Sequence, residues 1–120
     1  MTEIKSTKQY DLEERTFCFA RDMIEFTTTP SRTMSNVEIA RQVIRSSGSV
    51  GANYIEANEA LSKKDFAMRI KICRKEAKES KYWLRLVQIK EDSTEKRRQG
   101  LINEATELVK IFSSIVEKTK

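Results

Sequence analysis

Residues 46–60 read SSGSVGANYIEANEA, and the way this stretch folds decides the fold of the whole chain. Two glycines, Gly48 and Gly51, lie three positions apart between serines. A phosphate-binding P-loop needs a longer glycine spacing and a GK[ST] ending, which Asn53 and Tyr54 do not supply. A GxxG loop of the KH type matches the spacing, but KH modules also need strands and the sequence indicates none.

The apolar and small positions around this stretch recur at the spacing of one continuous helix. At 100° per residue they fall on one side, which favours a packed helix over a ligand-binding loop. Ser47 with Gly51, and Gly48 with Ala52, then form small-xxx-small pairs. Each glycine costs about 1 kcal/mol relative to alanine inside a helix, and the close approach of a neighbouring backbone would offset that cost. The positions on this side are Val37, Ala40, Val43, Ile44, Ser47, Val50, Gly51 and Tyr54.

A first helix is predicted upstream, from about Asp11 to Thr28. The TTTPSRTMSN segment that follows contains the only proline, Pro30, and predicts a loop. We expect the core side of this helix to consist of Leu12, Phe19, Met23 and Phe26, widened by Phe17, Ala20 and Ile24.

The helix through residues 46–60 is expected to start near Asn36, because Ser35 and Glu38 are spaced as a capping box. Ser62 and Asp65 form a second capping box, which predicts a third helix over Lys63–Glu91. Asp92 or Ser93 is expected to cap a fourth helix, whose apolar stripe is Leu101, Ile102, Ala105, Leu108, Ile111, Phe112, Ile115 and Val116.

Four amphipathic helices joined mostly by short loops predict an all-α fold, an up-and-down antiparallel four-helix bundle. The 120 residues suit a single domain over 1–120, with residues 1–10 as a flexible tail. The chain has no signal-peptide pattern and no window close to the roughly 18 apolar residues of a membrane span. We therefore expect a cytoplasmic protein without membrane contact.

The chain contains no histidine, which excludes Ser-His and Cys-His nucleophile pairs. Cys18 and Cys73 belong to no CxxC pair, so we predict two buried free thiols. An enzyme remains an alternative only if glutamates gather metals, as in di-iron bundles, but those sites use Glu-x-x-His pairs. We predict a protein that is not an enzyme and has no cofactor and no metal. The glutamates of that alternative are Glu56, Glu59, Glu76 and Glu79.

The predicted third helix carries two separate apolar strips. One is expected to fill the core and consists of Phe66, Ile70, Cys73, Ala77, Ser80, Leu84 and Val87. The other consists of Met68, Ile72, Trp83 and Leu86, although a surface helix usually needs only one strip. This second strip either packs against another helix of the bundle or forms a subunit interface, for which its methionine and tryptophan are typical.

Between these strips the same helix carries a ridge of basic residues. Residues 62–91 contain ten Lys and Arg and four Asp and Glu, a balance of +6 in a chain of net charge +5. Such a ridge suits phosphate contacts, although a charged stripe is also often a solvated helix face. The basic residues are Lys64, Lys71, Arg74, Lys75, Lys78, Lys81 and Arg85.

Three blocks of this region, SVGANYIEA, SKKDF and KEAKESKYWLRL, resemble a known family. The resemblance runs from about Phe17 to Phe112 and is to the bacterial four-helix-bundle proteins encoded by intervening sequences of 23S rRNA genes. It implies a homopentamer, which fits an oligomer interface at Met68, Ile72, Trp83 and Leu86. Asn53 and Glu56 match a polar pair of the family, for which we expect a role in helix packing or capping.

The family is related to the accessory variability proteins of diversity-generating retroelements, which are basic pentamers associated with nucleic acid and a reverse transcriptase. The resemblance therefore implies an RNA- or DNA-binding surface at Lys64, Lys71, Arg74, Lys75, Lys78 and Arg85. The retroelement proteins tend to be more basic than +5, which favours the plain intervening-sequence type. The alternative is a protein-protein adaptor, in which the Trp83 strip binds a partner such as a reverse transcriptase and the lysines provide solubility.

Overall fold

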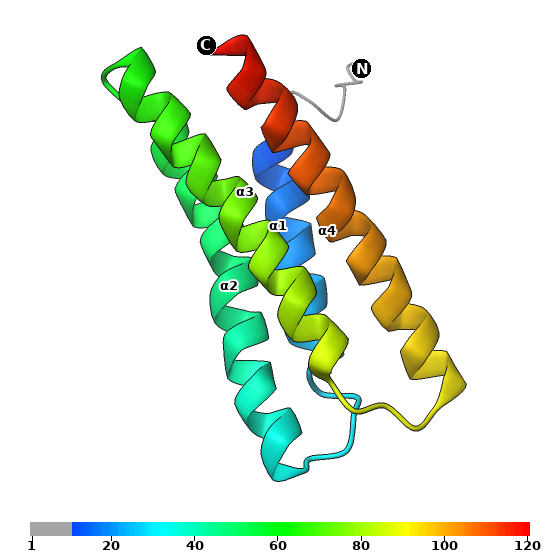
Figure 1. The fold of residues 1–120 in the computed structure, drawn as a ribbon. Helices are drawn as coiled ribbons and strands as arrows, with labels where there is room; N and C mark the ends of the chain where they lie inside the picture. The colour runs from blue at the N-terminus through cyan, green and yellow to red at the C-terminus, as the bar shows by residue number, and fades with distance from the viewer. Residues whose placement is uncertain (1–10) are drawn as a thin grey trace, which may run out of the picture.

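The computed structural model describes residues 11–120, which form four helices arranged as a bundle (Figure 1). Successive helices run in opposite directions; α2 packs along α3, α3 along α4, and α1 contacts both α2 and α4. The predicted all-α, up-and-down antiparallel four-helix bundle is confirmed. The predicted flexible tail, residues 1–10, lies outside the described residues. The helices are α1 (Leu12–Phe26), α2 (Met34–Asn58), α3 (Lys63–Leu86) and α4 (Asp92–Lys118).

The core of the bundle takes one apolar stripe from each helix. The four positions expected from α1 are all buried, as are Ile70, Cys73 and Leu84 on α3 and Leu108 and Phe112 on α4. The prediction that Phe17 and Ile24 widen the core stripe of α1 is wrong, because their side chains are 59% and 48% exposed. They lie beside the buried stripe, since α1 contacts only α2 and α4 and the stripe between them is narrow.

The glycine-containing stretch is one uninterrupted helix, because α2 runs through both glycines without a break. A Cβ placed on Gly51 would lie 3.0 Å from Thr16 Oγ1 of α1, so this glycine allows α1 and α2 to approach closely. Ser47 is fully buried on the same side. The packing role expected for Gly48 and Ala52 is wrong, because both are exposed and a Cβ on Gly48 would meet no described atom within 4 Å.

The beginnings of the helices follow local capping. Ser62 caps α3 as predicted, with its Oγ accepting from the backbone N–H of Asp65 at 3.0 Å. The α2 helix begins at Met34, before the expected start, because Thr33 rather than Ser35 is the N-cap. The Thr33 Oγ1 accepts from the backbone N–H of Asn36 at 3.1 Å.

The end of α3 differs from the prediction by several residues. The helix ends at Leu86 and not at Glu91, because Val87 adopts an extended conformation. The buried Asn36 then holds the following residue, since its Oδ1 accepts from the Gln88 N–H at 2.9 Å and its Nδ2 donates to the Gln88 carbonyl at 3.0 Å. This contact between the first turn of α2 and the loop after α3 is not visible in local periodicity. The α4 helix starts at Asp92, with Glu91 in the N-cap position.

Candidate nucleic-acid interface

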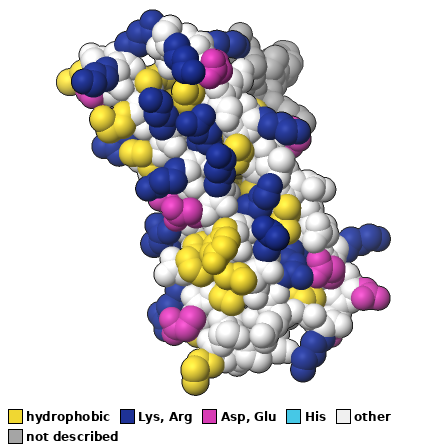
Figure 2. Space-filling model, in the orientation of Figure 1, with side chains coloured by type: hydrophobic (Ala, Val, Ile, Leu, Met, Phe, Trp, Pro, Cys, Tyr) yellow, Lys and Arg dark blue, Asp and Glu magenta, His cyan; other side chains and the backbone are white. Residues whose placement is uncertain are grey.

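The outer side of α3 presents a row of cations, which we call the basic ridge. Five of its side chains are exposed and Arg74 is half-buried. Lys and Arg side chains gather over α3 and beside α4 on the face shown in Figure 2. A single rigid helix thus holds the whole predicted binding set together. The basic ridge consists of Lys64, Lys71, Arg74, Lys75, Lys78 and Arg85.

Most side chains of the basic ridge have no acidic partner. Within residues 11–120, only Lys75 of the six lies within 4.0 Å of a carboxylate, with its Nζ 3.8 Å from Glu76 Oε2. Glu79, one helical turn after Lys75, is instead held by Arg45 of α2. Lys81 does not belong to the free cations, since its Nζ donates to Thr106 Oγ1 of α4 at 3.0 Å.

The side of α3 that faces α2 has the opposite character, because its polar groups are paired. The Arg69 Nη1 donates to Asn53 Oδ1 at 2.9 Å, which agrees with the packing role expected for Asn53. Two fully buried hydroxyls meet across the same seam, with Ser80 Oγ 2.9 Å from Ser46 Oγ. These contacts join α2 to α3 and leave the outer side of α3 free.

Arg45 of α2 forms ion pairs with two glutamates of this seam. Its Nη1 lies 3.5 Å from Oε1 of the buried Glu76 and its Nη2 lies 3.2 Å from Oε1 of Glu79. Glu76 and Glu79 are therefore ion-pair partners. Glu56 and Glu59 lie on the surface near the end of α2. Within residues 11–120, no group of three or more His, Cys, Asp or Glu side chains is positioned to hold a metal ion.

The second apolar strip of α3 is divided between surface and core. Met68 and Leu86 are 52% and 44% exposed, whereas Ile72 and Trp83 are half-buried. Trp83 packs against the core, and the exposed Tyr82 stacks edge-on against it with ring centroids 5.1 Å apart. Trp83 thus packs within the bundle, as one alternative expects, while the two ends of the strip face solvent. The subunit interface stays a prediction.

Further large apolar side chains are exposed on α1 and on α2. They include Phe17 and Ile24 on α1 and Ile44 and Ile55 on α2, all between 41% and 59% exposed. Helical spacing places each pair on one side of its helix. The sequence pattern predicts core positions for Phe17, Ile24 and Ile44, so their exposure is a correction; the excess width of those stripes was the available signal.

The two cysteines are free and lie in different environments. Cys73 is fully buried, and burial raises the pKa of its thiol to about 12. The prediction of a buried thiol is wrong for Cys18, which is half-buried beside Glu14. Cys73 is therefore not a reactive thiol of low pKa.

Ion pairs also secure α4. The Arg15 guanidinium on α1 binds Glu104 with Nε 2.7 Å from Oε2, and this hydrogen bond raises the pKa of Arg15. The Arg98 guanidinium binds Glu95, which lowers the pKa of that carboxyl, and its Nη1 donates to the Leu84 carbonyl at 3.2 Å near the end of α3. Arg15 and Arg98 therefore stabilise the bundle and are not free to bind a ligand.

None of the helices in residues 11–120 combines the length and the apolar character that crossing a bilayer requires.

Comparison with known proteins identifies the family of this chain. The family model for the 23S rRNA-intervening sequence protein matches residues 8–114. Among curated proteins, none matches the chain. A crystal structure from Bacteroides thetaiotaomicron, of a protein with unknown function from the S23 ribosomal protein family, is similar, with 27% identity and a TM-score of 0.74. The similarity covers 87% of this chain and 96% of that one. The chain belongs to the 23S rRNA-intervening sequence protein family.

Proposed function

We propose that this protein is not an enzyme and that it binds the phosphate backbone of RNA or DNA through the basic ridge. The observation that supports this proposal is the row of cations on α3, of which all but Lys75 lack an acidic partner within residues 11–120. Each phosphate neutralised by such a cation releases counterions and adds to the affinity. A cation already paired with a carboxylate contributes much less, which is why the absence of partners matters.

The dimensions of the basic ridge suit a nucleic-acid backbone. From Lys64 to Arg85 the helix rises about 32 Å at 1.5 Å per residue. That length is close to one turn of a duplex, roughly 34–36 Å. The basic ridge offers no Asn or Gln to read base edges. We therefore expect binding that depends on charge and shape more than on base sequence.

Self-association is part of the proposal. The chain exposes apolar side chains on α3 and others on α1 and on α2, and a contact between two different surfaces builds a ring when its rotation closes. The homopentamer implied by the family resemblance is such a ring. Five copies of the basic ridge in one particle would raise the overall affinity through multivalency.

The exposed ends of the α3 strip favour a second candidate function. Met68, Tyr82 and Leu86 are the kind of exposed methionine, aromatic and leucine side chains found at protein-protein contacts. In this candidate the protein is an adaptor that binds a protein such as a reverse transcriptase through the strip. Specific capture of such a protein without bound nucleic acid would favour it.

The proposal is tested by fluorescence polarisation with labelled duplex RNA, duplex DNA and single strands over a range of salt concentrations. The test variant carries Lys71→Glu, Lys75→Glu and Lys78→Glu. The control carries Arg32→Glu, Lys90→Glu and Lys96→Glu, which are exposed and lie in loops or at the start of α4. Each reversal changes the charge by two, so both variants move from +5 to −1.

We expect wild type to bind with a steep salt dependence and the test variant to lose at least about tenfold in affinity, because several phosphate contacts are removed. The control is expected to retain more of the affinity, and both variants should keep wild-type helicity by circular dichroism. Equal losses in both variants would contradict the assignment to the basic ridge. Absence of binding at low salt would reject the nucleic-acid function and favour the adaptor.

A further inference from the structure

One end of the bundle contains a cavity that the basic ridge does not explain. It lies between the start of α3 and the end of α4 and has a volume of about 630 Å³. This volume is within the roughly 300–1,000 Å³ typical of small-ligand pockets. We propose that this cavity binds an unpaired nucleotide of the nucleic acid that lies on the basic ridge. The inference rests on the proposed function and adds the kind of nucleic acid that the site prefers.

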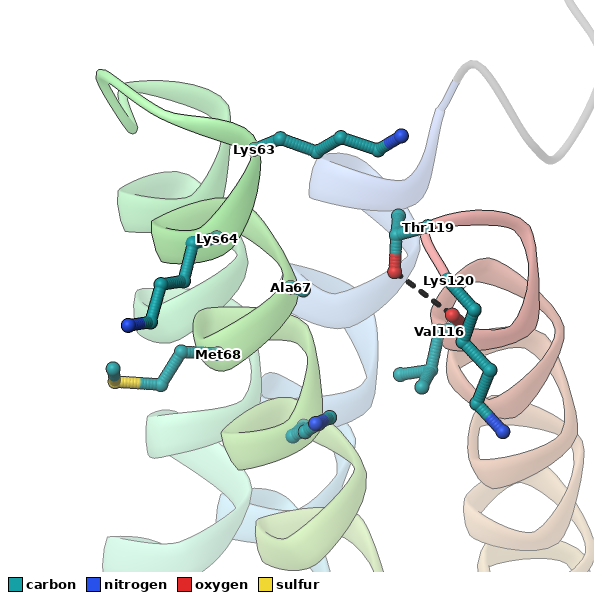
Figure 3. A pocket seen from close by; sticks show the side chains of 8 residues that line it. Lys63, Lys64, Ala67, Met68, Val116, Thr119 and Lys120 are labelled. Carbon is teal, nitrogen blue, oxygen red and sulfur yellow. Dashed lines mark hydrogen bonds between the residues drawn. The ribbon is translucent and has the colours of Figure 1, made fainter.

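The cavity exists because small side chains face each other across the two helices. Ala67 on α3 and the buried Val116 on α4 form apolar walls, and Met68 lies at the edge. Lys63 reaches across the gap from α3 toward the other helices, while Thr119 and Lys120 come from the end of α4 (Figure 3). In the same view Lys64 and Met68 point outward from α3.

The charge of the lining selects an anion. Four lysines line the cavity, and none of the lining side chains from residues 11–120 is acidic. The Lys120 Nζ is 2.9 Å from Glu117 Oε2. The amines of Lys63 and Lys71 have no carboxylate within 4.0 Å among residues 11–120, so their charge is available to a ligand. The cavity therefore combines an apolar floor with a cationic rim, which suits a ligand with an apolar body and a phosphate.

The cavity is continuous with the basic ridge, because Lys64 and Lys71 belong to both. A strand whose phosphates lie along the basic ridge therefore leads toward the cavity. The bases of a duplex are stacked and paired inside it, so only an unpaired nucleotide can place its base against Ala67 and Val116. A fatty acid has a comparable division into anionic head and apolar body, and the experiment separates the two.

The first experiment compares, by fluorescence polarisation, a blunt duplex with the same duplex carrying a short single-stranded extension. We expect the extension to tighten binding by about fivefold, the lower end of what contacts to one base contribute. Ala67→Trp fills the cavity, and Lys63→Gln removes a cation that lies outside the basic ridge. Each should abolish the preference and leave blunt-duplex affinity within about twofold. The control is Ser114→Trp at an exposed position of α4, which should keep the preference.

The second experiment follows the methyl NMR signals of Ala67 and Val116 during titration with adenosine monophosphate and, separately, with decanoate. It reports on the cavity even if the basic ridge binds no duplex, so failure of the proposed function and failure of this inference are distinguishable. Perturbation by the nucleotide supports the inference. Perturbation by decanoate alone, no perturbation, or a preference for the extension that survives in Lys63→Gln and Ala67→Trp would overturn it.

Discussion

Charged side chains lie on both sides of α3, but they differ in their partners. On the side facing α2, Arg69 is bound by Asn53, and Arg45 reaches across to Glu76 and Glu79. On the outer side, Lys71, Lys78 and Arg85 face solvent without an acidic partner in residues 11–120. Charged residues on this helix therefore contribute to bundle assembly where partners exist, and where partners are absent we propose that they contact a ligand.

The largest expected difference between the buried and the outer side of α3 is at two leucines that lie two positions apart. Leu84 is fully buried, and Leu86 is 44% exposed. We expect Leu84→Ala to lower the free energy of unfolding by about 2–5 kcal/mol, because it leaves a cavity in the core. Leu86→Ala should cost less than about 1 kcal/mol. Urea denaturation monitored by circular dichroism measures both, and equal losses would show that the outer strip also belongs to the core.

The second comparison uses Arg45, which reaches α3 from α2, and Arg85 on the outer side of α3. Arg45→Ala removes one of the two cations beside the buried Glu76 carboxylate, the other being Lys75, and we expect a loss of about 1–2 kcal/mol in the free energy of unfolding. Arg85→Ala on the outer side removes no ion pair and should change stability by less than about 0.5 kcal/mol. Urea denaturation at low salt measures both losses. A larger loss for Arg85→Ala than for Arg45→Ala would show that the outer cations stabilise the fold.

The third prediction concerns pH and the core side of α3. The Cys73 pKa is about 12 in the folded protein, against an ordinary value of 9.0. Above pH 9 the unfolded chain loses this proton while the folded chain keeps it. Stability from the neutral thiol is thus fully present below pH 9 and falls as the pH rises toward 12, by about 1 kcal/mol at pH 10.

The control for this prediction is Cys73→Ala, which should show a weaker decline between pH 9 and pH 10 than wild type when both are unfolded by urea. Cys18→Ala, which retains the buried Cys73, is the matched single-cysteine variant. Parallel declines in wild type and Cys73→Ala would show that other groups cause the alkaline loss.

The smallest expected effect concerns the two glycines of α2. Gly48→Ala should raise the free energy of unfolding by about 0.5–1 kcal/mol, because alanine favours the helix and the new methyl group meets open space. Gly51→Ala should gain nothing, because its methyl group would lie 3.0 Å from Thr16 Oγ1. Thermal denaturation of the two variants measures the difference, and an equal gain would mean that Thr16 moves aside easily.

Much of the fold was predictable because the signals are local. The Ser62 cap, the continuous period through Gly48 and Gly51, and the core stripe of α3 all depend on residues within a few positions of one another. The end of α3 was not predictable in this way, since it depends on Asn36 binding Gln88 across 52 positions of sequence. The exposed position of Phe17 was missed for a similar reason, because the width of a core stripe is set by the neighbouring helices.

The candidate site, too, has features that local sequence predicts and features that depend on helix packing. The sequence by itself determined four amphipathic helices and the concentration of positive charge on the third, because both are properties of helical spacing and composition. Only the tertiary structure decided that Lys81 is held by Thr106 while Lys71 and Lys78 stay free, and that Ala67 and Val116 enclose a cavity with Lys63. The physical reason is that the partner of a side chain is set by which helix packs beside it and in what register.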